Sequence, residues 1–181
     1  MKKNLLLFYA LLIPFVFVKA QVNTTYLWHL HQPTYWGDLS KKNPNRYQIV
    51  KESQDLKISG ANNDKNGLAH PTNNLEEIFG TGDRVAAYQF APKNAINSIR
   101  DLPNAGAQIT YGGSLLENIN ELAQANQWGY SNSWIQNIKD AKSWKTSGGF
   151  PRMEMVSFTM HHALSPLLSD EALKKEIKAH Q

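Results

Sequence analysis

Two histidines, His29 and His31, are separated by one residue in the aromatic stretch TTYLWHLHQPTYWGD, residues 24–38. If this stretch forms a strand, alternate side chains point to the same face, so the two imidazoles lie on one side. Imidazoles at the end of a strand can bind a metal ion, donate hydrogen bonds to sugar hydroxyls, or form part of a buried structure. The pair alone leaves these three interpretations open.

Amide and aromatic side chains follow the histidine pair directly. Pro33 has no N–H and therefore ends a strand, which puts Gln32, Tyr35 and Trp36 on the following loop, at the rim of any cleft. Flat aromatic faces beside amide and imidazole donors are what a polyhydroxylated ring requires. The pattern therefore favours sugar binding.

A second polar group lies near the C-terminus, in the stretch GGFPRMEMVSFTMHHALSPLL. Glu154 is the one acid in an apolar run that ends before His161 and His162. A carboxylate on such a strand is costly to bury unless it is paired or faces a site. Glu154 is a candidate site residue on this argument, but it could also face solvent or pair with Arg152.

Strands and helices are expected to alternate along the chain. Period-2 runs predict strands at residues 25–31, 107–113 and 152–158, and period-3.6 runs predict helices at 92–101, 114–125, 131–144 and from 169 onwards. Ser114 and Glu117 have the spacing of a capping box, which favours Glu117 as a capping residue over a catalytic one. The polar stretch 38–74 predicts a long loop. This order indicates an α/β fold with parallel pairing, in which the carboxyl ends of the strands form the site.

The N-terminus has the features of a secretory signal peptide. Lys2 and Lys3 precede an apolar run that ends at Ala20, so residues 1–20 are predicted to be removed and residues 21–181 to form the mature domain, secreted or periplasmic. An uncleaved membrane anchor is the weaker alternative. Without the three lysines of this segment the net charge falls from +4 to +1, so the basic character does not indicate nucleic-acid binding. The chain has no cysteine and hence no disulfide or thiolate metal site.

Three motifs in order resemble glycoside hydrolase family 57. The stretch His29-Leu30-His31-Gln32-Pro33 resembles the first signature of that family, YGGSLLENINEL resembles a strand-to-helix segment, and RMEMVSFTMHHALSPLL resembles the second signature. The resemblance implies the first part of an incomplete (β/α)7 TIM-like barrel and a retaining enzyme that acts on α-linked glucans. It also implies that His31 and Glu154 contact the sugar at the cleavage subsite, supported by His29 and His162, without a metal or other cofactor.

The resemblance has departures that bear on catalysis. Pro151, Ala163 and Ser165 differ from the usual second signature. In the family the nucleophile and the acid/base lie on later strands, and only 27 residues follow Glu154 here, so the chain is expected to be a fragment without the catalytic pair.

Two other functions stay open on the sequence alone. One is a secreted sugar-binding module without catalysis, for which the ligand is again an α-glucan or related oligosaccharide. The other is a metal-dependent hydrolase that uses the His29–His31 pair, with His161 or His162 as a third ligand.

Overall fold

The computed structural model describes residues 24–35, 39–40, 42–59 and 74–180. A parallel sheet of three strands lies at the centre of the described chain. Its strands are β1 (Leu27–Leu30), β2 (Ala107–Tyr111) and β3 (Met153–Met155), in the order β1-β2-β3. Leu27 pairs with Gln108, and Gln108 pairs with Glu154, so the register is continuous across the sheet. All three carboxyl ends therefore point the same way.

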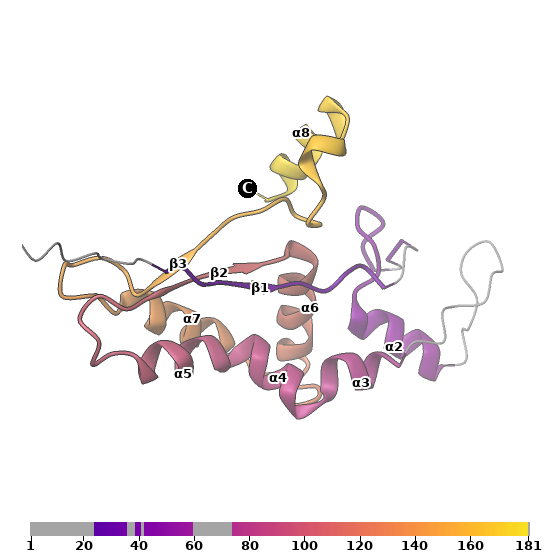
Figure 1. Cartoon of the computed structure of the whole chain (residues 1–181). Coiled ribbons are helices and arrows are strands. Elements are labelled where there is room, and N and C mark those ends of the chain that lie inside the picture. Colours follow the sequence, from indigo (N-terminus) through magenta and orange to yellow (C-terminus); the bar gives the residue numbers. More distant parts are fainter. Residues whose placement is uncertain (1–23, 36–38, 41, 60–73, 181) are drawn as a thin grey trace, which may run out of the picture.

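Helices connect the strands and cover one face of the sheet (Figure 1). Their bounds are α2 (Val50–Ile58), α3 (Leu75–Gly80), α4 (Gly82–Gln89), α5 (Ala91–Ser98), α6 (Gly113–Gln124), α7 (Trp134–Ser143) and α8 (Asp170–His180), with a 3-10 turn η2 (Ser165–Leu167) before α8. Figure 1 shows α8 on the opposite side of the sheet from α4, α5 and α7. The open face of the sheet is therefore flanked by α8.

The apolar core lies between the sheet and the covering helices. Ile109 and Met153 face this core from the strands, and Leu115, Ile119 and Leu122 present the apolar stripe of α6 to it; all five are fully buried. The stripe recurs at helical spacing, as the sequence predicts. The core helices pack against one face of the sheet only, so side chains on the other face are available to form a site.

The predicted alternation of strands and helices is confirmed, with corrections at several boundaries. The first and last strands are shorter than expected, and α3 and α4 were not predicted. The long loop expected over residues 38–74 is wrong in part, because α2 occupies residues 50–58. This helix has only a weak apolar stripe, so its sequence carries little periodic signal.

The predicted capping box at the start of α6 is also wrong. The helix begins at Gly113 with Gly112 as its N-cap, so Ser114 already lies inside the first turn. The Ser114 hydroxyl instead donates to the backbone carbonyl of Gln32 at 2.7 Å. Ser114 therefore links the helix to the chain that leaves β1, and Glu117 is exposed on the helix surface.

The predicted signal peptide and Trp36 lie outside the described residues. None of the helices in the described part of the chain is long and apolar enough to cross a membrane. Mixed helices and parallel strands make the chain an α/β protein.

Candidate functional site

Three histidines lie together at the carboxyl end of the sheet. The ring centroids of His29 and His162 are 4.0 Å apart, those of His31 and His162 are 5.0 Å apart, and those of His29 and His31 are 6.0 Å apart. Phe158 packs its ring against His162 at 5.2 Å and edge-on against His29 at 5.9 Å. We call these four residues the imidazole cluster.

The positions of His29 and His31 follow from the strand β1. Their nearly parallel rings, 12° apart, reflect the period-2 spacing that places both on the open face of the sheet. Gly112 makes room for His31 at the end of β2. A Cβ atom at Gly112 would lie 2.7 Å from Nδ1 of His31, so a residue with a side chain here would displace the imidazole.

His162 reaches the cluster from the connection after β3. Its backbone has a φ of 59°, in the left-handed region that non-glycine residues adopt rarely. Strained backbone of this kind persists where surrounding contacts hold it and is concentrated at functional sites. The turn at His162 points its ring toward β1, whereas the neighbouring His161 binds Glu176 of α8, with 2.7 Å between Nδ1 and the carboxylate.

The imidazole cluster and the adjacent Thr110 contain polar atoms without hydrogen-bond partners among the described residues. Nδ1 of His31, Nε2 of His162 and the hydroxyl of Thr110 are buried and unpaired among the described residues. Thr110 pairs with His29 across the sheet and is fully buried. Unpaired buried polar groups are costly and mark sites where a ligand or water completes the hydrogen bonding. Two ring nitrogens of the cluster and the neighbouring hydroxyl are therefore not used by hydrogen bonds within the described chain.

Two imidazoles of the cluster, those of His29 and His31, favour their neutral form. Burial, and then the nearby charge of His162, lowers the pKa of both His29 and His31 below the ordinary value of 6.5. No carboxylate of the described chain counters this effect on either group. A neutral imidazole has one N–H donor and one acceptor nitrogen, which suits hydroxyl groups that can both donate and accept.

Glu154 does not join the imidazole cluster. Glu154 pairs with Gln108, and Gln108 pairs with Leu27, so Glu154 lies level with Leu27 in the sheet. His31 comes four residues after Leu27 along the chain. Four residues of strand span about 13 Å, and β2 separates β1 from β3. The exposed Glu154 carboxylate accepts a hydrogen bond from Gln108 at 3.2 Å. The expectation that His31 and Glu154 meet in one cleft is therefore corrected.

Of the two alternatives for Glu154, exposure to solvent is confirmed, and pairing with Arg152 is wrong. The guanidinium of Arg152 is buried and donates only to backbone carbonyls within the described chain, those of Lys145, Ile99, Arg100, Leu102 and Ala105. In a regular strand, Arg152 and Glu154 would point to the same face, because one residue separates them. Arg152, however, lies just before β3 begins. Its side chain turns toward the loops at the amino end of the sheet.

Gln32 lies behind the cluster. Its side chain is 6% exposed, and both of its polar atoms are used: the nitrogen donates to the hydroxyl of Tyr88 and the oxygen accepts from the hydroxyl of Tyr35. Gln32 therefore positions the hydroxyl of Tyr35, and its predicted role in sugar binding stays a prediction. Trp36 cannot be placed because it lies outside the described residues.

Thr110 and Phe158 belong to the site but were not among the predicted site residues. Phe158 precedes His162 by four residues in an apolar run, where it resembles any core residue. Only the pairing of β1 with β2 brings Thr110 beside His29, and sequence periodicity does not specify that register. No group of three His, Cys, Asp or Glu side chains within the described ranges is arranged to hold a metal ion.

The chain is similar to a protein named alpha-amylase from Niallia circulans. The two are 28% identical over 179 residues, which cover 90% of this chain and 14% of that protein. The chain therefore spans a small part of the length of its relative. No protein-family model and no solved structure matches the chain. The structure and this comparison together describe an α/β chain that is similar to one segment of a much longer protein called an alpha-amylase.

Proposed function

We propose that this chain is the sugar-binding part of a carbohydrate-active enzyme, a glycoside hydrolase or glucanotransferase of the family 57 type, whose substrate is an α-linked glucan. The observation that carries the proposal is the imidazole cluster, with its unpaired ring nitrogens at the carboxyl end of parallel strands. The similarity to a protein named alpha-amylase supports the substrate class.

The chemistry of the cluster suits a neutral sugar ring. His29, His31 and His162 offer ring nitrogens that can donate or accept hydrogen bonds, and the lowered pKa values of His29 and His31 favour their neutral form. Phe158, which is 40% exposed, adds an apolar ring. Sugar rings have apolar faces and hydroxyl edges, so an aromatic face combined with imidazoles can bind both. The hydroxyl of Thr110, beside His29 on the neighbouring strand, would add a further hydrogen-bonding group.

Cleavage needs groups that the cluster does not contain. A retaining glycosidase uses two carboxylates about 5 to 5.5 Å apart. Glu154 lies on β3, level with Leu27 and away from His31, and Glu117 lies on the surface of α6. We therefore infer that the 181-residue chain binds α-glucans without measurable turnover, and that further chain supplies the catalytic pair in the enzyme. A sugar-binding module without catalysis is the second candidate, supported by the same geometry.

Calorimetric titration with maltohexaose tests binding at the cluster. We expect His31→Ala to weaken binding about tenfold or more, because it removes an imidazole that hydrogen-bonds sugar hydroxyls. Glu154→Gln is the matched control, since it changes a polar residue of the same sheet outside the cluster, and it should leave the affinity unchanged. Equal effects of the two substitutions, or no binding by the unsubstituted protein, would refute the proposal.

Turnover distinguishes the two candidates. A longer protein that includes this segment should release sugars from α-glucan with retained anomeric configuration, and His31→Ala in it should lower kcat/KM. A longer protein that binds glucan but never cleaves it would establish the sugar-binding module instead. Hydrolysis by the 181-residue chain alone that is lost on mutation of Glu154 would show that the roles proposed here are wrong.

We also propose that the protein is exported and that its mature form begins at Gln21. The proposal rests on the lysines, the apolar run and the small residues at the end of residues 1–20. N-terminal sequencing of protein from the extracellular or periplasmic fraction should start at Gln21. Recovery of Met1 in that fraction would contradict cleavage.

A further inference from the structure

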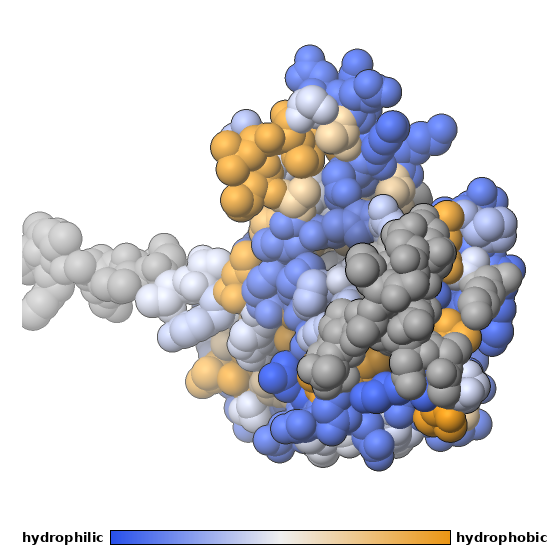
Figure 2. Space-filling view, turned by 90° about the vertical axis from the view of Figure 1, so that its right-hand side faces the viewer, coloured by the Kyte–Doolittle hydropathy of each residue, from blue (hydrophilic) through white to orange (hydrophobic). Residues whose placement is uncertain are grey.

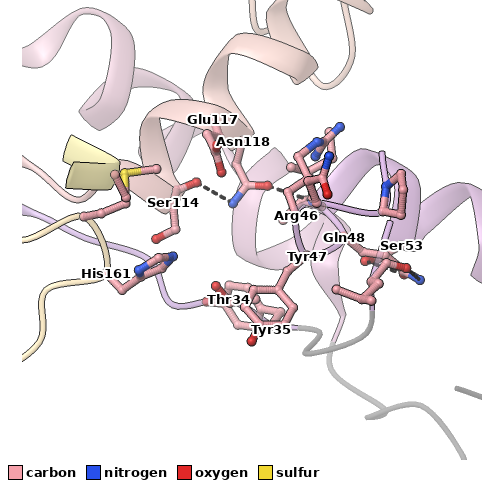
Figure 3. Close-up of a pocket in the computed structure, with 17 residues that line it drawn as sticks. Thr34, Tyr35, Arg46, Tyr47, Gln48, Ser53, Ser114, Glu117, Asn118 and His161 are labelled. Atoms are coloured by element: carbon pink, nitrogen blue, oxygen red, sulfur yellow. Dashed lines mark hydrogen bonds between the residues drawn. The ribbon is translucent and has the colours of Figure 1, made fainter. Parts of the chain in front are cut away.

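A cavity separate from the imidazole cluster lies between the chain after β1, the N-terminus of α2, α6 and His161 (Figure 3). Its volume is about 400 Å³, which falls in the range of small-molecule sites. We call it the tyrosine cavity and define it by six of its lining residues: Tyr35, Arg46, Tyr47, Glu117, Asn118 and His161.

The floor of the tyrosine cavity is held rigidly by hydrogen bonds. Asn118 accepts from the backbone N–H of Val50 at 2.7 Å and donates to the carbonyl of Ser114 at 2.8 Å, so it joins α2 to α6. Ser114 in turn donates to the carbonyl of Gln32, whose side chain fixes the hydroxyl of Tyr35. These groups are buried or half-buried and satisfied, which makes the cavity preorganised rather than a gap that closes by side-chain rotation.

The rim, in contrast, offers groups that are free to bind. Among the described residues, the side chains of Arg46 and Glu117 have no hydrogen-bond or ion-pair partner. Tyr47 is 51% exposed, a large aromatic surface to leave in water. An exposed aromatic ring beside unpaired polar groups is the arrangement expected at a ligand site.

The charges of the lining indicate a neutral ligand. Arg46 and Glu117 contribute one positive and one negative charge, and the remaining polar lining consists of amides, hydroxyls and the His161 imidazole that already binds Glu176. An anion or a cation would find one of the two charges unfavourable. A neutral polyhydroxylated molecule can use both, because hydroxyl groups accept from the guanidinium and donate to the carboxylate.

The tyrosine cavity shares two chain segments with the imidazole cluster. His31 belongs to the cluster, while Tyr35, four residues later, lines the cavity; His162 belongs to the cluster, while His161 lines the cavity. We infer that the tyrosine cavity is an additional sugar subsite, which binds a glucosyl unit of the same α-glucan at a distance from the unit at the imidazole cluster. This inference rests on the proposed function and extends it to a multi-unit substrate.

The test compares glucans of different length. We expect Tyr47→Ala to weaken maltohexaose binding about tenfold by removing the ring on which a sugar can stack, and to leave the affinity for maltose at the cluster unchanged. Tyr47→Phe, which keeps the ring, should restore most of the loss. Tyr26→Ala is the matched control, because Tyr26 is also exposed, at 65%, but lies at the amino end of the sheet.

The outcomes separate this inference from the proposed function. If Tyr47→Ala and Tyr26→Ala bind maltohexaose equally well while His31→Ala binds it weakly, the tyrosine cavity is not a subsite and the proposed function stands. If the unsubstituted protein binds neither sugar, both are overturned. As a second measurement, maltohexaose should shift the ring resonances of Tyr47 in NMR spectra of the unsubstituted protein, and unchanged resonances would refute the subsite.

Discussion

At the scale of single residues, the imidazole cluster depends on how closely its neighbours approach. Gly112 has ordinary extended backbone angles, so its role is to leave space for His31. The strained turn of His162 and the unpaired hydroxyl of Thr110 add to this arrangement. The left-handed backbone of His162 and the unpaired hydroxyl of Thr110 are each unfavourable for stability. A ligand bound at the imidazole cluster, as proposed above, would offset both.

The lowered pKa values of His29 and His31 predict loss of stability in mild acid. In the unfolded chain both groups take up protons near pH 6.5, whereas burial and the charge of His162 keep them neutral to lower pH in the fold. The unfolded state therefore binds more protons as pH falls below about 6.5, and stability decreases with it. We expect Tm to fall between pH 7.5 and pH 5.5, as measured by circular dichroism.

The double substitution His29→Gln and His31→Gln provides the control for this prediction. It removes both titrating groups and should flatten the dependence of Tm on pH in that window. The hydrogen bonds from His161 overcome the effect of burial and hold the pKa of Glu176 below 4.5, so that carboxylate adds its own pH dependence only in stronger acid. A pH dependence that is identical in the double variant would contradict the assignment to the cluster.

At the scale of elements, one buried guanidinium joins the segments that lead into β2 and β3. Arg152 donates to the carbonyls of Leu102 and Ala105 at 2.8 Å and to that of Lys145 at 2.9 Å, so it organises both loops at the amino end of the sheet. Carbonyls that lose a charged donor and stay buried are costly.

Arg152→Met should destabilise the protein strongly. We expect the free energy of unfolding to fall by on the order of 3 kcal/mol, because several carbonyls lose their donor at once. Urea unfolding measures the change. Arg100→Met is the matched control: the Arg100 guanidinium lies over the Trp144 ring at 4.6 Å, a contact worth about 0.5 to 1 kcal/mol at exposed sites. Similar losses in the two variants would refute the role of Arg152.

The elements with a strong periodic signal could be predicted from the sequence, and those without it could not. The apolar stripe of α6 and the short β-prone run of β2 gave correct elements, whereas the polar composition of α2 concealed a helix. The His29–His31 pair was correctly placed on one face at the end of a strand. This prediction needs only the alternation of side chains within that strand, and no knowledge of its neighbours. Glu154 was misplaced relative to His31 because their relation depends on the register of three strands, which local patterns do not encode.

At the scale of the whole molecule, the described chain exposes large apolar side chains on the outer strands of the sheet and in the segment from η2 to α8. Figure 2 shows hydrophobic surface on one flank of the projecting part of the molecule. In and before η2 and in α8, the exposed large apolar residues are Leu164, Leu167 and Ile177. On the sheet, Leu27 of β1 and Met155 of β3 are also exposed. Within the described residues, each of these outer strands pairs with β2 alone.

An unpaired strand edge with exposed apolar side chains favours pairing between molecules. We therefore expect the 181-residue protein to self-associate as its concentration rises, and Leu27→Lys to reduce this association, because a charged side chain on an edge strand opposes edge-to-edge pairing. Sedimentation velocity over a range of concentrations measures the effect. Leu102→Lys is the matched control, since Leu102 is 55% exposed, close to the 44% of Leu27, but lies in the loop before β2. Equal suppression by the two substitutions would assign the association to general hydrophobicity and not to the edge of β1.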